Sequence, residues 1–352
     1  MLVYWALLFF FALGAVHQGS QEGSSRAPRS ASPMLVIGIV LVIIIVGLRN
    51  EVGADWFNYV GVFSDLRAKG LGSALSSGDP GYQFVNWGVK QAGQGIWLVN
   101  LVCAAIFGWG LLRFVRAQLD PWLAMVIAIP YFVIVVGMGY TRQAVALGIL
   151  IAGFGALERG ASVIRFAIYV AVAALFHKTA VVGLPLVIFS SKRNRLLNFI
   201  AGIALSVLAY DVFLSESVHY LVKNYIDARY GSQGAAIRVT MNLVPAAIFL
   251  SKGKQLGFPL NQERIWRAFS LTAVALLIAL FVSPSSTAVD RISLYIMPLQ
   301  LAVLARTPSL FRDWRIGRYI IVAYAVAVQF TWLNFAAHAR SWVPYNFYPT
   351  SA

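Results

Sequence analysis

The feature that most constrains this chain is its series of long, almost uncharged apolar runs, such as MLVIGIVLVIIIVG at residues 34–47. A run of this length can enter or cross a bilayer as a helix, and it lacks the alternation of a membrane β-strand. Only 12% of the 352 residues are charged, whereas a soluble domain carries about 25%. The sequence therefore predicts an all-α, polytopic helical bundle that forms one integral membrane domain.

The apolar segments predict about twelve crossings (roughly 10 to 13), some of them short paired helices, with both chain ends on one side. Their boundaries fall at residues 1–16, 34–48, 95–115, 121–139, 142–157, 166–177, 178–190, 196–213, 237–250, 268–283, 292–305 and 319–335.

The distribution of charge predicts the orientation of these segments. When alternate loops are assigned to the two sides, one side receives 17 of the 28 Lys and Arg residues with 5 of the 13 acidic residues. That side is predicted to be cytoplasmic, since basic residues accumulate in cytoplasmic loops. Both termini then lie outside, together with the segments 49–94, 214–236 and 336–352. The net charge of +15 is explained by orientation, so no nucleic-acid partner is expected.

Residues 166–190 read either as one long helix with the motif HKT at its centre, or as two short helices that meet at His177 and Lys178. A single helix would place a charged pair in the middle of the bilayer, at a cost of about 3 kcal/mol or more per charge. It would also put the basic run SKRNR on the outer side. We therefore predict two helices that meet at the outer face.

Four arginines on the predicted outer side stand at the ends of apolar segments: Arg49, Arg142, Arg238 and Arg291. Basic residues are usually depleted at such positions, because they accumulate in cytoplasmic loops. A guanidinium stays charged and binds phosphate oxygens in two-point geometry. Together they predict a site for an anionic ligand at the outer leaflet. For any one of them, an equally good reading is that the side chain reaches lipid phosphate or caps a helix.

Candidate bases lie near the same face. His177 has a side chain whose pKa suits proton transfer near neutral pH, although a lone histidine also serves as an ordinary hydrogen-bonding residue. Asp55 and Tyr59 would share one face of a short helix, and Asp290 precedes Arg291. Either aspartate could instead form an ion pair. With a single cysteine and four scattered histidines, no metal site and no cofactor are predicted.

Several motifs occur in a characteristic order between residues 49 and 346: RNEVGADWFNY, GDPGYQFVNW, TRQAVALGI, ALFHKTAVVGLPL, DRISLY and WVPYN. In this order and spacing the chain resembles the EpsG-like branch of the Wzy polysaccharide polymerases, which are integral membrane enzymes of O-antigen and exopolysaccharide assembly. The first segment and the polar linker after it fall outside this pattern.

The resemblance implies a membrane glycosyltransferase of the bacterial inner membrane with its active site facing the periplasm. Its substrates would be oligosaccharide repeat units linked to undecaprenyl pyrophosphate, a carrier that lies among the membrane lipids. The growing chain would pass from its lipid carrier to the non-reducing end of another lipid-linked unit. A flippase and a chain-length regulator of the same pathway are the implied partners, and no cofactor is implied.

In this reading Arg142 and Arg291 bind the donor pyrophosphate, and Arg49 and Arg238 support them. His177 deprotonates the acceptor hydroxyl, with Asp55 as the alternative base. The predicted sugar contacts are Tyr59, Gln143, Tyr295 and Tyr345. Direct displacement would invert the anomeric centre without a metal. Two rival functions stay open, a transporter of lipid-linked oligosaccharides and an O-antigen ligase.

Overall fold

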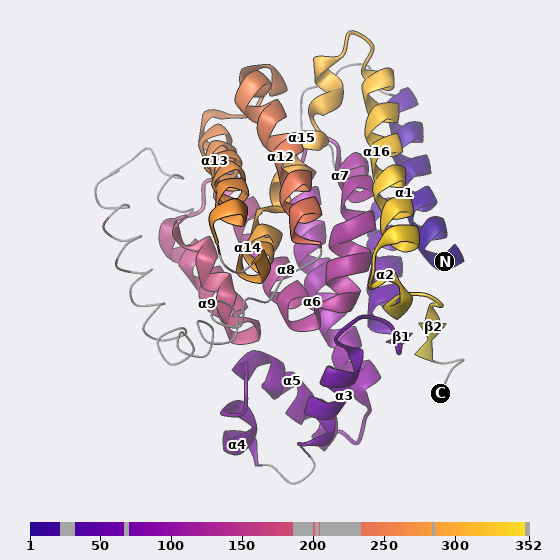
Figure 1. Cartoon of the computed structure of the whole chain (residues 1–352), viewed down its shortest axis with the longest axis vertical. Helices are drawn as coiled ribbons and strands as arrows, with labels where there is room; N and C mark the ends of the chain where they lie inside the picture. Colours follow the sequence, from indigo (N-terminus) through magenta and orange to yellow (C-terminus); the bar gives the residue numbers. More distant parts are fainter. Residues whose placement is uncertain are drawn as a thin grey trace.

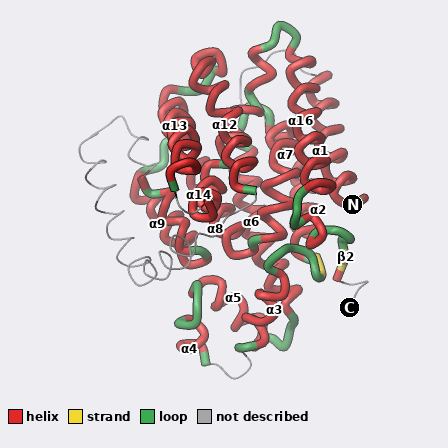
Figure 2. Tube along the Cα trace, viewed as in Figure 1, coloured by secondary structure: helices red, strands yellow, loops and turns green. Residues whose placement is uncertain are grey.

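The computed structural model describes residues 1–21, 32–66, 70–185, 200, 204, 234–283 and 286–348. It is 81% helical, which confirms the predicted all-α class (Figure 2). The elements of the first half are α1 (Leu2–Gln21), α2 (Pro33–Gly47), β1 (Arg49–Asn50), α3 (Trp56–Ser64), α4 (Leu71–Leu75), α5 (Pro80–Gln91), α6 (Ile96–Val115), α7 (Pro121–Ala128), the π-helix η1 (Ile129–Gly137), α8 (Thr141–Glu158), α9 (Val163–Phe176) and the 3-10 helix η2 (Lys178–Gly183).

The elements of the second half are α12 (Ala235–Lys252), η6 (Gly253–Leu256), α13 (Leu260–Val282), α14 (Ser286–Ser293), η7 (Leu294–Ile296), α15 (Pro298–Leu304), η8 (Thr307–Leu310), α16 (Trp314–Phe335), η9 (Ala339–Ser341) and β2 (Asn346–Phe347). The long helices form one bundle, and α3, α4 and α5 lie together beyond one end of it (Figure 1). We call this the α5 end and the opposite one the far end.

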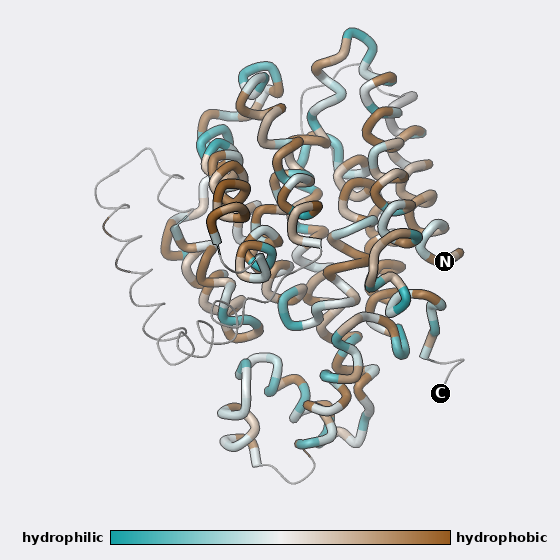
Figure 3. The backbone as a smooth tube through the Cα atoms, viewed as in Figure 1, coloured by the Kyte–Doolittle hydropathy of each residue, from teal (hydrophilic) through white to brown (hydrophobic). Residues whose placement is uncertain are grey.

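Four of the described helices are long and apolar enough to cross a membrane by themselves: α6, α12 with η6, α13 and α16. A fifth candidate span is the pair Ser286–Ile296 and Pro298–Leu310, which is bent by 43°. The shorter apolar helices are α1, α2, α7 with η1, and α9. Apolar residues cover the helices of the bundle, and hydrophilic residues gather in the connecting loops (Figure 3).

Apart from 292–305, the predicted segments before residue 178 and after residue 236 coincide with helices, but the count of twelve stays a prediction. Residues 196–213 and nearly all of the predicted loop 214–236 lie outside the described residues. One predicted segment, 292–305, is not a single helix. The chain is helical from Ser286 and breaks before Pro298, since proline has no N–H to donate to the preceding turn.

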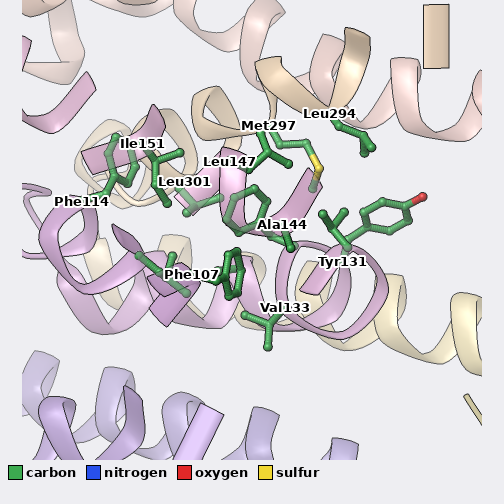
Figure 4. Close-up of a cluster of buried hydrophobic side chains, with 14 of the residues drawn as sticks. Phe107, Phe114, Tyr131, Val133, Ala144, Leu147, Ile151, Leu294, Met297 and Leu301 are labelled. Atoms are coloured by element: carbon green, nitrogen blue, oxygen red, sulfur yellow. The ribbon is translucent and has the colours of Figure 1, made fainter. Parts of the chain in front are cut away.

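The centre of the bundle is α7 with η1, whose side chains are buried on all sides. Phe107 of α6, Leu147 of α8, Met297 and Leu301 pack together in this core, near Tyr131 of η1 (Figure 4). Helices α6 and α8 approach closely, because a Cβ atom on Gly110 would overlap the carbonyl of Gly148. Small residues of this kind let helix backbones pack against one another where hydrophobic driving force is weak.

The prediction that the helix breaks at HKT is confirmed. Helix α9 ends at Phe176, and His177 is its C-cap in an extended conformation with φ −158° and ψ 113°. The chain continues as the 3-10 helix η2. Helix α9 packs on α5, so the break lies at the α5 end. The rest of the predicted second helix, from residue 186, lies outside the described residues.

The start of α1 and strand β2 lie at the same end of the bundle (Figure 1). The hydroxyl of Tyr4 donates to the carbonyl of Trp342 at 2.6 Å. The Trp342 indole in turn donates to the carbonyl of Ile134 at 2.8 Å. Strands β1 and β2 pair antiparallel, with Arg49 opposite Phe347. The tail therefore packs into the fold and holds the loop that follows α2.

Candidate functional site

A carboxylate at the start of α5 organises the polar cluster at the α5 end. Asp79 occupies the N-cap position, yet its side chain accepts no hydrogen bond from its own helix. Instead, Oδ2 accepts from Nη1 of Arg142 at 2.8 Å and lies 3.9 Å from Nδ1 of His177. The Asp79 side chain is only 7% exposed. This buried aspartate therefore interacts with Arg142 and His177 and does not cap its own helix.

His177 stands at the helix break, where it is the C-cap of α9 in an extended conformation. The side chain is 23% exposed, so one edge of the ring remains accessible. Burial lowers the pKa of His177 below its usual 6.5, while the nearby carboxylate of Asp79 acts in the opposite direction. At neutral pH the ring is therefore uncharged. With Nδ1 turned toward Asp79, Nε2 is the nitrogen left to accept a proton.

Arg142 stands in the first turn of α8, where the free backbone N–H groups of the helix also favour anions. Its guanidinium lies 5.9 Å from the centre of the Tyr59 ring, and the Tyr59 ring packs on Tyr82 at 5.6 Å. The Arg142 side chain is nevertheless 42% exposed. One edge of this guanidinium pairs with Asp79, and the side chain as a whole is still partly open to solvent.

Asp55 lies beside this group, as the short-helix prediction required. It is the N-cap of α3, and its carbonyl accepts from the Tyr59 N–H at 3.1 Å. Burial raises the pKa of Asp55, and Arg291, Arg142 and His177 act against that rise. The same three side chains thus surround Asp55 electrostatically, although no ion pair with a neighbouring arginine is formed within the described residues.

Arg291 and Gln143 form a reciprocal pair. Nη1 of Arg291 donates to Oε1 of Gln143 at 3.1 Å, and Nε2 of Gln143 donates to the Arg291 carbonyl at 3.3 Å. The guanidinium also lies 4.5 Å from the ring centre of Tyr140. Next to this pair the hydroxyls of Tyr295 and Thr179 are 2.7 Å apart. The broken helix around η7 therefore brings Arg291 and Tyr295 to the start of α8.

Three predicted residues do not reach the open cluster. Arg49 is 1% exposed, and its guanidinium donates hydrogen bonds to the carbonyls of Val46 and Val52 and to the Thr141 hydroxyl. Arg238 is paired with Asp290, Nε to Oδ1 at 2.5 Å, so this aspartate forms the ion pair that was its alternative reading.

The third is Tyr345, whose hydroxyl donates to the carbonyl of Ile45 and whose ring packs edge-on against Tyr4. The other seven of the ten predicted residues lie together at the α5 end, and we call them the open cluster: Asp55, Tyr59, Arg142, Gln143, His177, Arg291 and Tyr295. Arg142 and His177 are partly exposed in it, whereas Tyr59, Gln143 and Tyr295 are at most 4% exposed. Among the described residues, no three His, Cys, Asp or Glu side chains come together as a metal site requires.

Comparison with known protein families decides the assignment, since the model of the EpsG family matches residues 34–347. The chain belongs to the EpsG family. Membership makes it a multi-pass membrane protein of polysaccharide biosynthesis in a family associated with glycosyltransferase-like polymerases. Neither a search of curated proteins nor a search of solved structures gave a match. The EpsG match contains every residue of the open cluster and leaves out α1.

Sequence reasoning missed Asp79. In the motif GDPGY it precedes a proline at the start of a helix, which is the usual pattern of an N-cap. Its role became visible only from the contacts of the folded chain. The one signal in the sequence was that an acidic residue stands in the same outer segment as Asp55, facing the predicted arginines.

Proposed function

We propose that this EpsG-family protein polymerises oligosaccharide repeat units carried on undecaprenyl pyrophosphate, and that the reaction takes place at its α5 end. The acceptor sugar hydroxyl attacks the anomeric carbon of the donor. The new C–O bond forms as the bond to the pyrophosphate oxygen breaks, and the hydroxyl proton passes to Nε2 of His177. Because the displacement is direct, the anomeric centre is inverted.

The contact of Asp79 with both Arg142 and His177 is the observation that carries this proposal. It places an uncharged imidazole beside an arginine that is partly open to solvent. A base that is neutral at working pH can accept the hydroxyl proton, while guanidinium groups stabilise the charge on a leaving pyrophosphate. Asp79 orients the ring and keeps its accessible nitrogen as the acceptor.

The remaining residues take supporting roles in this proposal. Arg291 joins Arg142 at the pyrophosphate, and Asp55 is the alternative base. Tyr59, Gln143 and Tyr295 are at most 4% exposed, so in this proposal they support the arginines from within the fold and do not contact the sugars directly. Arg49, Arg238 and Tyr345 act from behind the cluster, by holding the loop after α2 and the broken helix in place.

The side of the membrane follows from charge. The segments 251–267 and 306–318 join helices at the far end and carry eight Lys and Arg residues between them. Basic loops face the cytoplasm, so the α5 end faces the periplasm of the inner membrane. A flippase of the same pathway would deliver the lipid-linked units to that face, and a chain-length regulator would act on the product.

Reconstitution tests the reaction. The purified protein is incorporated into nanodiscs and given a lipid-linked repeat unit in the presence of EDTA, and products are separated on a gel. We expect a ladder of polymers. A folded protein that binds the substrate without forming a ladder would contradict polymerisation. Movement of the unit across a vesicle membrane would then indicate a transporter, and transfer to a lipid A core acceptor would indicate a ligase.

A further inference from the structure

An apolar groove of about 690 Å³ opens on the outside of the bundle between α6, α8 and α9. Its walls include Ile106 and Trp109 of α6, Ile149 of α8, and Ile168, Val172 and Phe176 of α9. Arg165 is the one charged side chain among the described residues that line it. Because the rest of this described lining is almost entirely apolar, a flexible apolar chain is the occupant that fits the groove best.

The groove extends to the end of α9, next to the proposed reaction centre. Phe176, which lines it, is followed directly by His177, and Arg165 lies eleven residues earlier in the same helix. At the rise of an α-helix these residues span about 16 Å, or about half the hydrocarbon thickness of a bilayer. An apolar chain attached to a group at His177 can therefore enter the groove without leaving the membrane.

We infer that this groove binds the isoprenoid tail of the donor substrate, and not that of the acceptor. This inference rests on the proposed function. The donor tail is bonded to the pyrophosphate that leaves from the reaction centre. The acceptor lipid is separated from its attacking hydroxyl by a complete repeat unit. A groove that starts one residue from the base can thus be reached only by the donor tail, and the growing chain is the substrate that it anchors.

A photoaffinity experiment tests the occupant without requiring turnover. Undecaprenyl pyrophosphate that carries a diazirine in its tail is added to the protein in nanodiscs of phosphatidylglycerol and phosphatidylethanolamine. We expect labelled peptides from α6 and α9, and loss of label when unlabelled undecaprenyl pyrophosphate is added. Label that maps elsewhere, or that extra phosphatidylglycerol removes equally well, would show ordinary membrane lipid in the groove and overturn the inference.

Kinetics with a matched pair of variants tests the donor assignment. Ala105 lines the groove and Ala171 is exposed on α9 outside it, so Ala105→Trp fills the groove and Ala171→Trp does not. We expect Ala105→Trp to raise the KM for an undecaprenyl-linked donor about tenfold. The KM for a geranyl-linked donor, whose tail is too short to fill the groove, should not change.

The acceptor KM should also stay unchanged, as should all constants of Ala171→Trp. The inference would be overturned if the two variants raised the donor KM equally. It would also be overturned if Ala105→Trp raised the KM of both donors equally, or raised the acceptor KM. If the wild-type protein forms no polymer, the proposed function fails while the labelling still reports on the groove. If polymer forms and the label lies elsewhere, the inference alone fails.

Discussion

Two arginine–carboxylate pairs, one at each end of the bundle, have the same chemistry and different surroundings. At the far end, Nη2 of Arg318 lies 2.5 Å from Oδ2 of Asp120, and both side chains are at most 7% exposed. Asp120 also caps α7, and Arg318 also donates to the carbonyl of Ala15. At the α5 end, Asp79 caps nothing and Arg142 is 42% exposed.

The difference separates a charge pair that stabilises the fold from one that we propose binds substrate in this chain. The hydrogen-bonding groups of the far pair join three helices, α1, α7 and α16, and both side chains are buried. The near pair leaves donors open next to an uncharged imidazole. Exposure and unused capacity, and not the presence of an ion pair, mark the site.

Replacing the far arginine should have the largest effect on stability. Arg318→Gln leaves Asp120 buried without its counter-charge, and breaking a buried pair in this way costs about 3–5 kcal/mol. We expect a strongly lowered thermal unfolding temperature in detergent, with any folded fraction still active. A variant as stable as wild type would show that this pair does not hold the fold.

The same change at the near pair should reverse the pattern. Arg142→Gln removes a partly exposed charge and leaves the buried Asp79 beside the ionisable ring of His177. We therefore expect a smaller loss of stability than for Arg318→Gln, together with loss of stabilisation of the leaving pyrophosphate. Loss of one such group lowers kcat by about 10²–10³. Arg340→Gln, which changes an exposed arginine at the same end, serves as the control. An active Arg142→Gln variant would remove the distinction between the pairs.

The loop that carries Asp55 offers a smaller test. Gly53 has φ of +109°, and a Cβ atom there would overlap the carbonyl of Met138. Gly53→Ala should therefore cost about 1–3 kcal/mol and reduce activity by moving Asp55. Gly61→Ala in the neighbouring α3 meets no atom within 4 Å and should leave both properties near wild type. Equal stability of the two variants would contradict the role given to this loop.

The smallest expected effect is a shift in pH dependence. The acid limb of kcat/KM should lie below pH 6.5, since burial lowers the pKa of His177 and activity requires the uncharged ring. Asp79 raises that pKa, so Asp79→Asn should move the limb to still lower pH while reducing the rate at neutral pH. An unchanged limb, measured from pH 4.5 to 8, would separate Asp79 from His177.

The sequence predicted the helices and the position of the arginines better than their partners. Apolar runs and the cost of burying His177 with Lys178 located the break after α9, because both depend on local composition. Pairing depends on how distant loops meet. Arg49 and Arg142 look alike in the sequence, because each is a charged residue at the end of an apolar run. In the structure, however, the Arg49 guanidinium is hydrogen-bonded to the Val52 carbonyl and the Thr141 hydroxyl. Asp79 resembled an ordinary cap for the same reason.

The first segment shows the same limit. Residues 1–16 lie outside the EpsG match, and nothing in their composition indicates a partner. In the structure, α1 donates a hydrogen bond from Tyr4 to the tail at the α5 end and accepts one from Arg318 at the far end. Its role as a brace between the two ends arises from tertiary contacts alone.

The most direct test of the account compares two histidines at the α5 end. His177 touches Asp79, whereas His338 is exposed in the tail outside the cluster. In the reconstituted polymerisation assay, His177→Ala should lower the initial rate by about 10²–10⁴ while its unfolding temperature stays near wild type. His338→Ala should form the wild-type ladder. A full ladder from folded His177→Ala would contradict the claim that the open cluster is the active site.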